Sequence, residues 1–289
     1  MSTLSRRNFL KLIKVAAIDL VLLTIGGAGY SYLLEPGWVV VENVKLKLRR
    51  LSPAFSGIRI AQVSDIHMGG WMNGVRLQHV VDMVTKENPD LLLLTGDYLL
   101  GHGFDEETLR NLQEMTEILT PLARSIPSYA ILGNHDHWTN VKAVRSMLRA
   151  SGIMELTNSV FTISRGSESL LLCGVDDVWS GIARLDVVLE KLPEDGAAIL
   201  LAHEPDFADA SAATGRFDLQ ISGHTHGGQI IVPFYGAPIL PYLGQRYPAG
   251  LYQVGDMFQY TNRGVGMARI PIRINCPPEI TLFTLESPE

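Results

Sequence analysis

The chain has 289 residues, of which 46% are hydrophobic and 19% are charged. This composition is typical of a globular protein with a sizeable core and excludes an intrinsically disordered chain. The net charge is −6 with histidine neutral. Basic residues that neutralise the phosphate backbone supply most non-specific affinity for DNA and RNA, so an acidic chain does not fit a nucleic-acid partner. Two cysteines are too few for a disulfide framework.

The N-terminal segment combines a basic start with an apolar stretch. The run Ser5-Arg6-Arg7-Asn8-Phe9-Leu10-Lys11 resembles a twin-arginine signal, which a translocase reads as an export address. The apolar stretch that follows reaches Leu34, and its last ~20 residues are about long enough for a hydrocarbon core of ~30 Å. The alternative is a plain membrane anchor whose basic start holds the N-terminus in the cytoplasm.

We therefore expect residues 1–35 to form a twin-arginine-like signal or membrane anchor, and residues 36–289 to form the functional domain. The expected partners of the first segment are the membrane and, if the protein is exported, the twin-arginine translocase. The expected location is membrane-associated, at the extracytoplasmic face of a bacterial inner membrane or in the periplasm.

The first half of the body alternates between apolar strands and amphipathic helices. Short apolar runs predict strands, and apolar residues spaced three and four apart predict helices. The predicted strands are 39–48, 58–63, 91–94 and 129–132, and the predicted helices are 75–87, 106–123 and 141–150.

Strands dominate the second half, at 160–163, 170–174, 197–201, 219–222, 229–232, 250–254, 257–261 and 280–285. Alternating strands and helices followed by a strand-rich half predict a layered α/β domain with two sheets. The sequence contains no internal repeat and no clear second domain.

Five short polar clusters each follow a predicted strand directly. They are Asp65-Ile66-His67, Gly96-Asp97, Gly133-Asn134-His135-Asp136, His203 and Gly223-His224-Thr225-His226. Ligand sites of open α/β sheets lie outside the carboxyl ends of the strands, so we expect these clusters to meet there. Asp, His and Asn side chains suit Mn, Fe, Co or Zn. On an extended segment, residues two apart point the same way, so Asp65 with His67 and His224 with His226 should each grip one ion.

The order of these clusters, D-x-H, GD, GNHD, H and GHxH, resembles that of the calcineurin-like metallophosphoesterases, from about Ile58 to His226. The tail, with Gly228-Gln229-Ile230 and Cys276-Pro277-Pro278, looks like one bacterial branch of membrane-associated phosphodiesterases with twin-arginine signals. The resemblance implies a layered α-β-β-α sandwich of two mixed sheets, with a dinuclear metal site at the carboxyl ends of the strands.

The resemblance also implies a role for each residue. The first of two divalent ions (Mn, Fe, Zn or Co) would be held by Asp65, His67, Asp97 and His226. The second would be held by Asp97, Asn134, His203 and His224, with Asp97 bridging both. His135 would protonate the leaving oxygen or stabilise the charged transition state. Asp136 would orient His135 or, as an equal alternative, act as a packing carboxylate behind the site.

The activity implied is hydrolysis of phosphodiester or pyrophosphate bonds, in which two metal ions activate a hydroxide. The expected substrate is a small phosphoester. A lipid-linked substrate such as UDP-2,3-diacylglucosamine, from lipid A biosynthesis, is one candidate because related enzymes of this branch act on it. Export conflicts with that candidate, since UDP-sugars are made on the cytoplasmic side. A phosphomonoesterase and a non-catalytic, membrane-associated metal-binding protein remain alternatives.

Substrate choice is expected to depend on loops that are not needed for the metals. Three of the four tryptophans, Trp71, Trp138 and Trp179, flank predicted site loops. His102 and His137 match no ligand position and are candidates to face the substrate. The segment from Gly96 to His102 lacks the arginine found at this motif in phosphoprotein phosphatases, so protein phosphatase activity is not expected.

Overall fold

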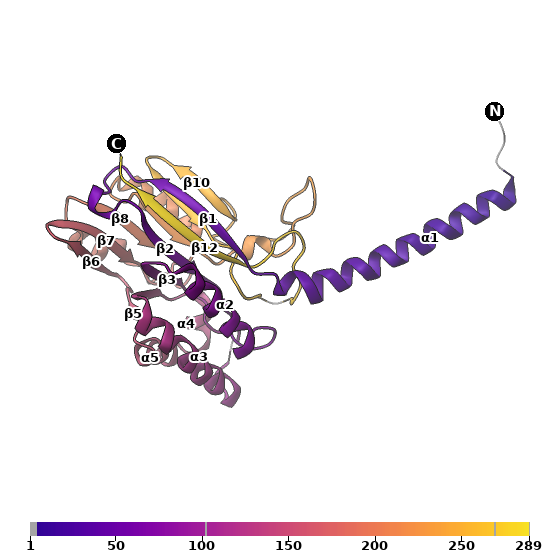
Figure 1. Cartoon of the computed structure of the whole chain (residues 1–289), viewed down its shortest axis with the longest axis horizontal. Coiled ribbons are helices and arrows are strands. Elements are labelled where there is room, and N and C mark those ends of the chain that lie inside the picture. The colour runs from indigo at the N-terminus through magenta and orange to yellow at the C-terminus, as the bar shows by residue number, and fades with distance from the viewer. Residues whose placement is uncertain (1–4, 102, 269, 289) are drawn as a thin grey trace.

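The computed structural model describes residues 5–101, 103–268 and 270–288, and contains two six-stranded mixed sheets. The first sheet runs in the order β1 (Val40–Lys47), β12 (Glu279–Glu286), β2 (Ile58–Val63), β3 (Leu91–Thr95), β4 (Ser128–Ile131) and β5 (Met154–Glu155). Neighbouring strands are parallel except β12 and β2, which are antiparallel. The parallel run β2–β3–β4 brings the carboxyl ends of three strands to one edge (Figure 1).

The second sheet is also mixed, but its antiparallel strands lie at the edges. Its order is β10 (Gly250–Val254), β11 (Met257–Thr261), β9 (Leu219–Ser222), β8 (Ala197–Leu201), β7 (Glu168–Gly174) and β6 (Ser159–Arg165). The four inner strands are parallel, and only the edge strands β10 and β6 run antiparallel to their neighbours. The carboxyl ends of β8 and β9 therefore lie side by side, so residues that follow these two strands lie close together.

The core shows how the layers stack. Leu93 of β3 and Ile199 of β8 pack in one buried cluster between the two sheets. Leu92 and Leu94 point to the other face of β3, where they pack with Val80 of α2. This alternation follows from the period of two along a strand.

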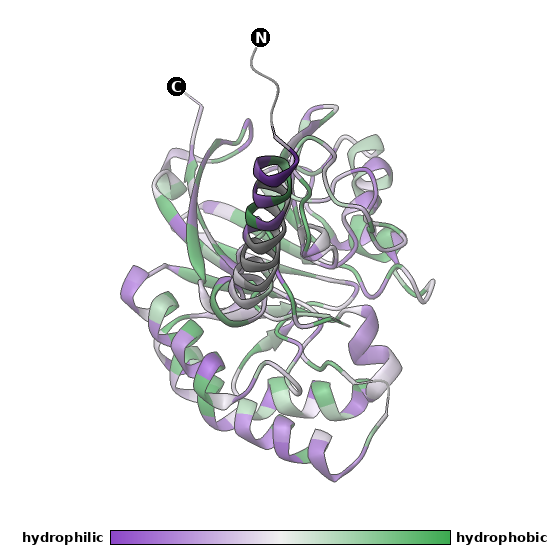
Figure 2. Ribbon diagram, turned by 90° about the vertical axis from the view of Figure 1, so that its right-hand side faces the viewer, coloured by the Kyte–Doolittle hydropathy of each residue, from purple (hydrophilic) through white to green (hydrophobic). Residues whose placement is uncertain are grey.

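Helices cover the outer faces of both sheets. The first sheet is covered by α2 (Gly74–Glu87), α3 (Glu106–Ser125) and α5 (Val141–Ala150), and the second by α6 (Leu185–Lys191) and α7 (Ala208–Ala213). Figure 2 shows green apolar and purple polar residues alternating along the helices, as expected for helices with one buried face. The predicted α-β-β-α sandwich is confirmed.

The longer helices begin at side-chain caps. The cap and the backbone amide it accepts from are Asn73 with Arg76, Asp105 with Thr108, and Asn140 with Ala143. Such a cap satisfies one of the amides that the first helical turn leaves unpaired.

The N-terminal helix α1 (Arg6–Gly29) projects away from the sandwich (Figure 1). It continues into a short root, residues 30–37, in which Ser31 and Glu35 are buried. The Glu35 carboxylate accepts the Cys276 amide at 2.6 Å, and the Ser31 carbonyl accepts the Arg273 amide at 3.0 Å. Within the residues described, no helix has both the length and the apolarity for a membrane crossing. The root is thus packed against the domain that follows it.

One predicted element is wrong. Residues 229–232 form no strand; they follow the short turn of helix His226–Gly228 and make only isolated bridges, Ile230 with Ile274 and Val232 with Gly236. Gln229 has a φ of 58°, which no regular strand accommodates, and Pro233 lacks the N–H that a strand needs.

Candidate metal centre

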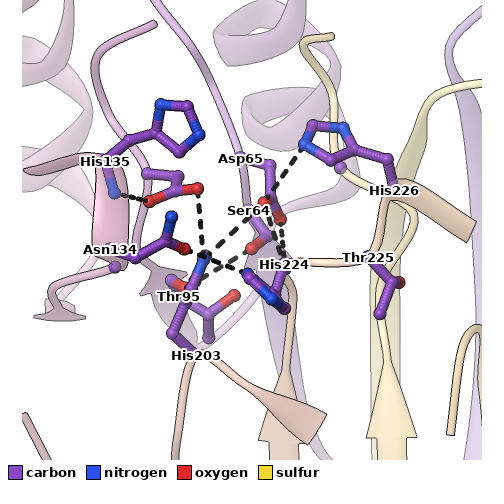
Figure 3. Close-up of polar contacts among 12 residues, drawn as sticks. Ser64, Asp65, Thr95, Asn134, His135, His203, His224, Thr225 and His226 are labelled. Carbon is purple, nitrogen blue, oxygen red and sulfur yellow. Dashed lines mark hydrogen bonds and ion pairs between the residues drawn. The ribbon is translucent and has the colours of Figure 1, made fainter. Parts of the chain in front are cut away.

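The seven predicted metal ligands lie together at the carboxyl ends of the strands. Figure 3 labels five of them, Asp65, Asn134, His203, His224 and His226. Asp65 and His67 follow β2, Asp97 follows β3, Asn134 begins the short helix α4 (Asn134–Thr139) after β4, His203 follows β8, and His224 and His226 follow β9. Each is at most 6% exposed. Buried polar side chains at this density require partners, which points to a site and not to packing.

Side chains that could hold a metal ion form three groups, and the ligand atoms of each group lie within 4.8 Å of one another. One group contains Asp65, His67 and His226, another contains Asp97, His203 and His224, and the third joins His67 and Asp97 to His135. The first two match the division into two ions that the family resemblance implies. His224 and His226 fall in different groups, whereas Asp65 and His67 share one. All four residues have left-handed φ values between 49° and 74°, so neither segment is extended and the rule for extended chains applies to neither pair.

Three of the imidazoles are oriented by backbone carbonyls. The contacts are His67 Nδ1 with Leu99 O at 3.3 Å, His203 Nδ1 with Thr95 O at 2.6 Å, and His224 Nε2 with Tyr242 O at 2.8 Å. A carbonyl only accepts, so the contacting nitrogen carries the proton and the other nitrogen has a free lone pair. Metal-ligating histidines show this arrangement.

The free lone pairs converge where a cation fits. His224 Nδ1 lies 3.0 Å from Asn134 Oδ1, although both atoms are acceptors. His203 Nε2 is buried and lies 3.2 Å from Asp97 Oδ2. His67 Nε2 and His226 Nε2 lie 3.0 Å apart. A divalent ion resolves such crowding of acceptors, so the donor set fits the metals that the family requires.

Burial keeps most of these histidines in the neutral form that metals bind. It lowers the pKa of His67 to about 3 and that of His224 to about 4. Burial alone would raise the pKa of Asp97, yet the neighbouring histidines, His203 above all, hold it well below its usual range. His203 is the exception: burial would lower its pKa, yet the Asp97 carboxylate beside it raises that pKa well above its usual range. Asp97 is therefore an ionised carboxylate paired with His203, and the other imidazoles of the predicted ligand set are neutral.

The backbone of the site is strained. Five site residues have φ between 49° and 74°: Asp65, His67, Asp97, His224 and His226. Left-handed non-glycine residues cost of order 1–3 kcal/mol each and cluster at functional sites. The rest of the sandwich must supply the stability that holds them.

Gly96 explains why the second motif begins with glycine. Its φ is 95°, and a Cβ there would lie 2.6 Å from the Gly133 nitrogen and 2.8 Å from His203 Nδ1. Gly223 meets a similar limit at the side chains of Ser64 and Asp65. Any larger residue would push the strand ends apart.

His135 lies beside the ligands. Its backbone amide donates to Asp97 Oδ1 at 2.9 Å, and its ring centroid is 4.7 Å from that of His67. It is half-buried, which leaves part of the side chain accessible beside the metal ligands.

Asp136 is fully buried and acts on the backbone. Its carboxylate accepts the amides of Asp97 at 3.0 Å, Tyr98 at 2.9 Å and Gly133 at 2.9 Å. It joins the loop of Asp97 to the loop of His135, a position that fits both predicted roles, the orientation of His135 and packing behind the site; its part in catalysis stays a prediction. Burial raises its pKa to about 7.

Sequence reasoning did not single out two buried carboxyl groups, Asp177 and Glu204. Glu204 directly follows His203, and burial together with the hydrogen bond to Asp177 raises its pKa well above the usual range. The only signal in the sequence was that Glu204 adjoins a predicted ligand. Of the two histidines expected to face substrate, His137 instead contacts Asp176 at 2.7 Å, and His102 lies outside the described residues.

A sandwich of this kind, with clustered Asp, His and Asn at the strand ends, defines a metal-dependent phosphoesterase. The sequence model described as calcineurin-like phosphoesterase matches residues 58–228, and the chain belongs to this family. It is a hydrolase that acts on phosphoester bonds.

Two relatives match over nearly their whole length. The chain is 36% identical to the uncharacterized metallophosphoesterase YkuE of Bacillus subtilis, over 99% of both chains. It is 32% identical to the phosphodiesterase YaeI of Escherichia coli, over 98% of this chain and 99% of the relative.

A more distant relative and a solved structure are also similar. A Danio rerio protein described as a transmembrane protein with metallophosphoesterase domain is 32% identical over 85% of this chain and 57% of its own length. A solved structure from Thermus thermophilus has a TM-score of 0.48 at 12% identity, over 73% of this chain and 91% of that chain. A similarity at this level carries no argument about function.

Proposed function

We propose that the protein hydrolyses phosphodiester or pyrophosphate bonds at two divalent ions. The ligands of the first ion are Asp65, His67, Asp97 and His226, and those of the second are Asp97, Asn134, His203 and His224. The position of Asp97 carries the proposal. Its Oδ2 lies 3.6 Å from His67 Nε2 in one group and 3.2 Å from His203 Nε2 in the other, as a bridging carboxylate should.

When bound, the ions activate water and neutralise the phosphoryl oxygens. The chain supplies the rest. Asp136 fixes the backbone of Asp97, and Asp97 in turn accepts the amide of His135. This places the His135 imidazole beside the ligands, where it donates a proton to the leaving oxygen.

The name of the relative YaeI, a phosphodiesterase, supports diesters over monoesters. We propose a lipid-linked phosphoester as the natural substrate, with UDP-2,3-diacylglucosamine as one candidate. Support comes from exposed apolar side chains on the loop after the last metal motif, namely Phe234, Tyr235 and Ile239.

That loop is connected to the root of α1. The Ile231 amide donates to Ile274 O, and the neighbouring Arg273 amide donates to Ser31 O. The root itself exposes Tyr32, Leu33 and Leu34. We therefore propose a membrane-associated protein at the extracytoplasmic face, delivered by the twin-arginine translocase; the name of the Danio rerio relative agrees with a membrane location. Fractionation of cells that express the chain, with and without Arg6→Lys and Arg7→Lys together, tests this; cytoplasmic activity in both would contradict it.

The activity is tested with the full chain, because a chain that starts after Glu35 would lose a buried contact. The Mn²⁺-loaded protein is assayed on an aryl phosphodiester and an aryl phosphomonoester, beside Asp97→Asn and His135→Ala. Metal-dependent turnover that favours the diester and is lost in both variants is the expected result. Preference for the monoester would replace the diester proposal, and metal binding without turnover of either would favour a non-catalytic role.

A further inference from the structure

A chain of aromatic rings extends outward from the metal ligands. Trp179 lies 5.6 Å from His224, 5.1 Å from Trp138 and 5.4 Å from Tyr242, measured between ring centroids. Trp138 in turn lies 5.0 Å from the ring of His135. These three residues, Trp138, Trp179 and Tyr242, form what we call the aromatic shelf. It therefore touches both a proposed metal ligand and the proposed proton donor.

The shelf is open to solvent. Trp179 is 37% exposed and Tyr242 is 61% exposed, although both are large apolar rings beside a polar site. The rings of His224, Trp138 and Tyr242 meet Trp179 at 77°, 88° and 80°, so all three contacts are edge-to-face. None of these three neighbours takes the parallel stacking position on the indole.

The position of Trp179 is built by buried groups. Its backbone amide lies 3.3 Å from Asp177 Oδ1 and 3.3 Å from Glu204 Oε1. The same two carboxyl groups accept the amides of Ser180 at 3.0 Å and Val178 at 3.2 Å. Buried carboxyl groups are costly unless they are hydrogen-bonded, and the amides of this loop provide those hydrogen bonds. Because such a buried network is rigid, the loop is fixed and not mobile. Because Glu204 follows His203, the loop is fastened to the metal centre itself.

We propose that the aromatic shelf binds a planar aromatic group of the substrate, such as a nucleobase, while the phosphate lies at the metal centre. This inference rests on the proposed function. Stacking on an aromatic side chain contributes about 1–3 kcal/mol per base and needs a rigid, exposed ring. A flexible acyl chain gains less from such a ring because it loses more conformational freedom on binding.

The test compares two ligands that share a ribose 5-phosphate and differ at C1′, where one carries a base and the other a hydroxyl. Binding of uridine 5′-monophosphate and ribose 5-phosphate to the Mn²⁺-loaded full chain is measured by calorimetry. The proteins are the wild type, Trp179→Ala, Trp179→Phe and, as a matched control, Trp38→Ala, which removes another exposed tryptophan. Bound Mn²⁺ is quantified in every sample.

In the wild type we expect uridine 5′-monophosphate to bind about tenfold more tightly than ribose 5-phosphate, equivalent to about 1.4 kcal/mol. The ratio should fall to about one in Trp179→Ala, remain largely intact in Trp179→Phe, and be unchanged in Trp38→Ala. Equal binding of the two ligands by the wild type, or an unchanged ratio in Trp179→Ala, would overturn the shelf. So would an equal loss for both ligands in Trp179→Ala, which would show a purely structural role beside His224.

Turnover of an aryl diester by the same samples separates the two claims. Turnover without any preference for the base would leave the proposed function intact and remove the shelf. A base preference without turnover of any ester would keep the shelf and remove the proposed function.

Discussion

The two sheets make different contributions to the site. The first sheet supplies both carboxylates and the amide, Asp65, Asp97 and Asn134, whereas the second supplies only imidazoles, His203, His224 and His226. Only His67 departs from this division. The two groups that divide the predicted ligands each contain residues from both sheets, whereas the third group, His67, Asp97 and His135, comes from the first sheet alone. The complete set of predicted ligands is therefore assembled only when the sandwich is closed.

Buried bonds between the sheets enforce that closure. Gln62 of β2 donates to Ser222 O of β9 at 2.9 Å, and the His224 amide donates to Asp65 Oδ1 at 3.0 Å. A buried donor or acceptor that loses its partner costs about 1–3 kcal/mol, so these bonds disfavour any sliding of the sheets. The first sheet therefore supplies the negative charge of the site, and the second sheet adds the imidazoles that complete the predicted ligand set.

The largest effect is expected at the carboxylate that serves both groups. Asp97→Asn should lower kcat/KM by about 10³-fold, or about 4 kcal/mol, because the amide removes the charge between the two ions. Metal content, measured by mass spectrometry, should fall as well. Asp82→Asn, an exposed carboxylate on α2, is the matched control and should behave as wild type. Retention of activity in Asp97→Asn would contradict the claim that the first sheet supplies the negative charge that the two ions need.

His135→Ala is expected to lower kcat by about 10²–10⁴-fold while bound metal stays constant, since the residue is placed as a proton donor and not as a ligand. Single-turnover kinetics with metal quantification in the same samples checks this. A loss of metal that matches Asp97→Asn would mean that His135 belongs to the ligand set, as its proximity to His67 and Asp97 would allow.

Asp136→Asn separates positioning from ligation. An amide can accept with one oxygen only, so at least one of the three backbone amides loses its partner, and we expect about 1–3 kcal/mol less stability in urea unfolding. Metal affinity should fall about 10–100-fold, because Asp97 is no longer held. Unchanged metal affinity would show that Asp97 is fixed without this carboxylate.

The smallest effect is expected at a helix cap that is not among the predicted ligands. Asn73→Ala removes the cap of α2, where its side chain accepts the Arg76 amide at 3.1 Å. It should cost about 1 kcal/mol of stability and leave kcat/KM unchanged. A matching loss of activity would show that the helix layer contributes to the site.

Local signals in the sequence predicted much of the fold. The predicted bounds of 58–63, 141–150, 197–201, 219–222, 250–254 and 257–261 agree with the structure. These segments combine a clear apolar period with turn residues at their ends. By contrast, the short elements α4, α6, α7 and β5 were missed. The helices have only six or seven residues and β5 only two, so none is long enough to show a period.

The motif order located the ligand residues but not their geometry. Asp65 with His67 and His224 with His226 were paired by the rule for extended chains. All four residues have a left-handed backbone, and only the first pair shares a group. Asp177 and Glu204 are far apart in the sequence and meet only through the packing of β7 and β8. No local pattern could have shown that they hold Trp179, because this support arises from tertiary structure alone.

The most direct test of the account is the metal stoichiometry of the full chain, measured together with diester turnover before and after chelation. We expect two Mn²⁺ per wild-type chain and a lower metal content in Asp97→Asn. Turnover should be lost when the metal is removed and restored when it is added back. Full turnover after complete removal of metal, or the same metal content in wild type and Asp97→Asn, would contradict a centre shared between the two sheets.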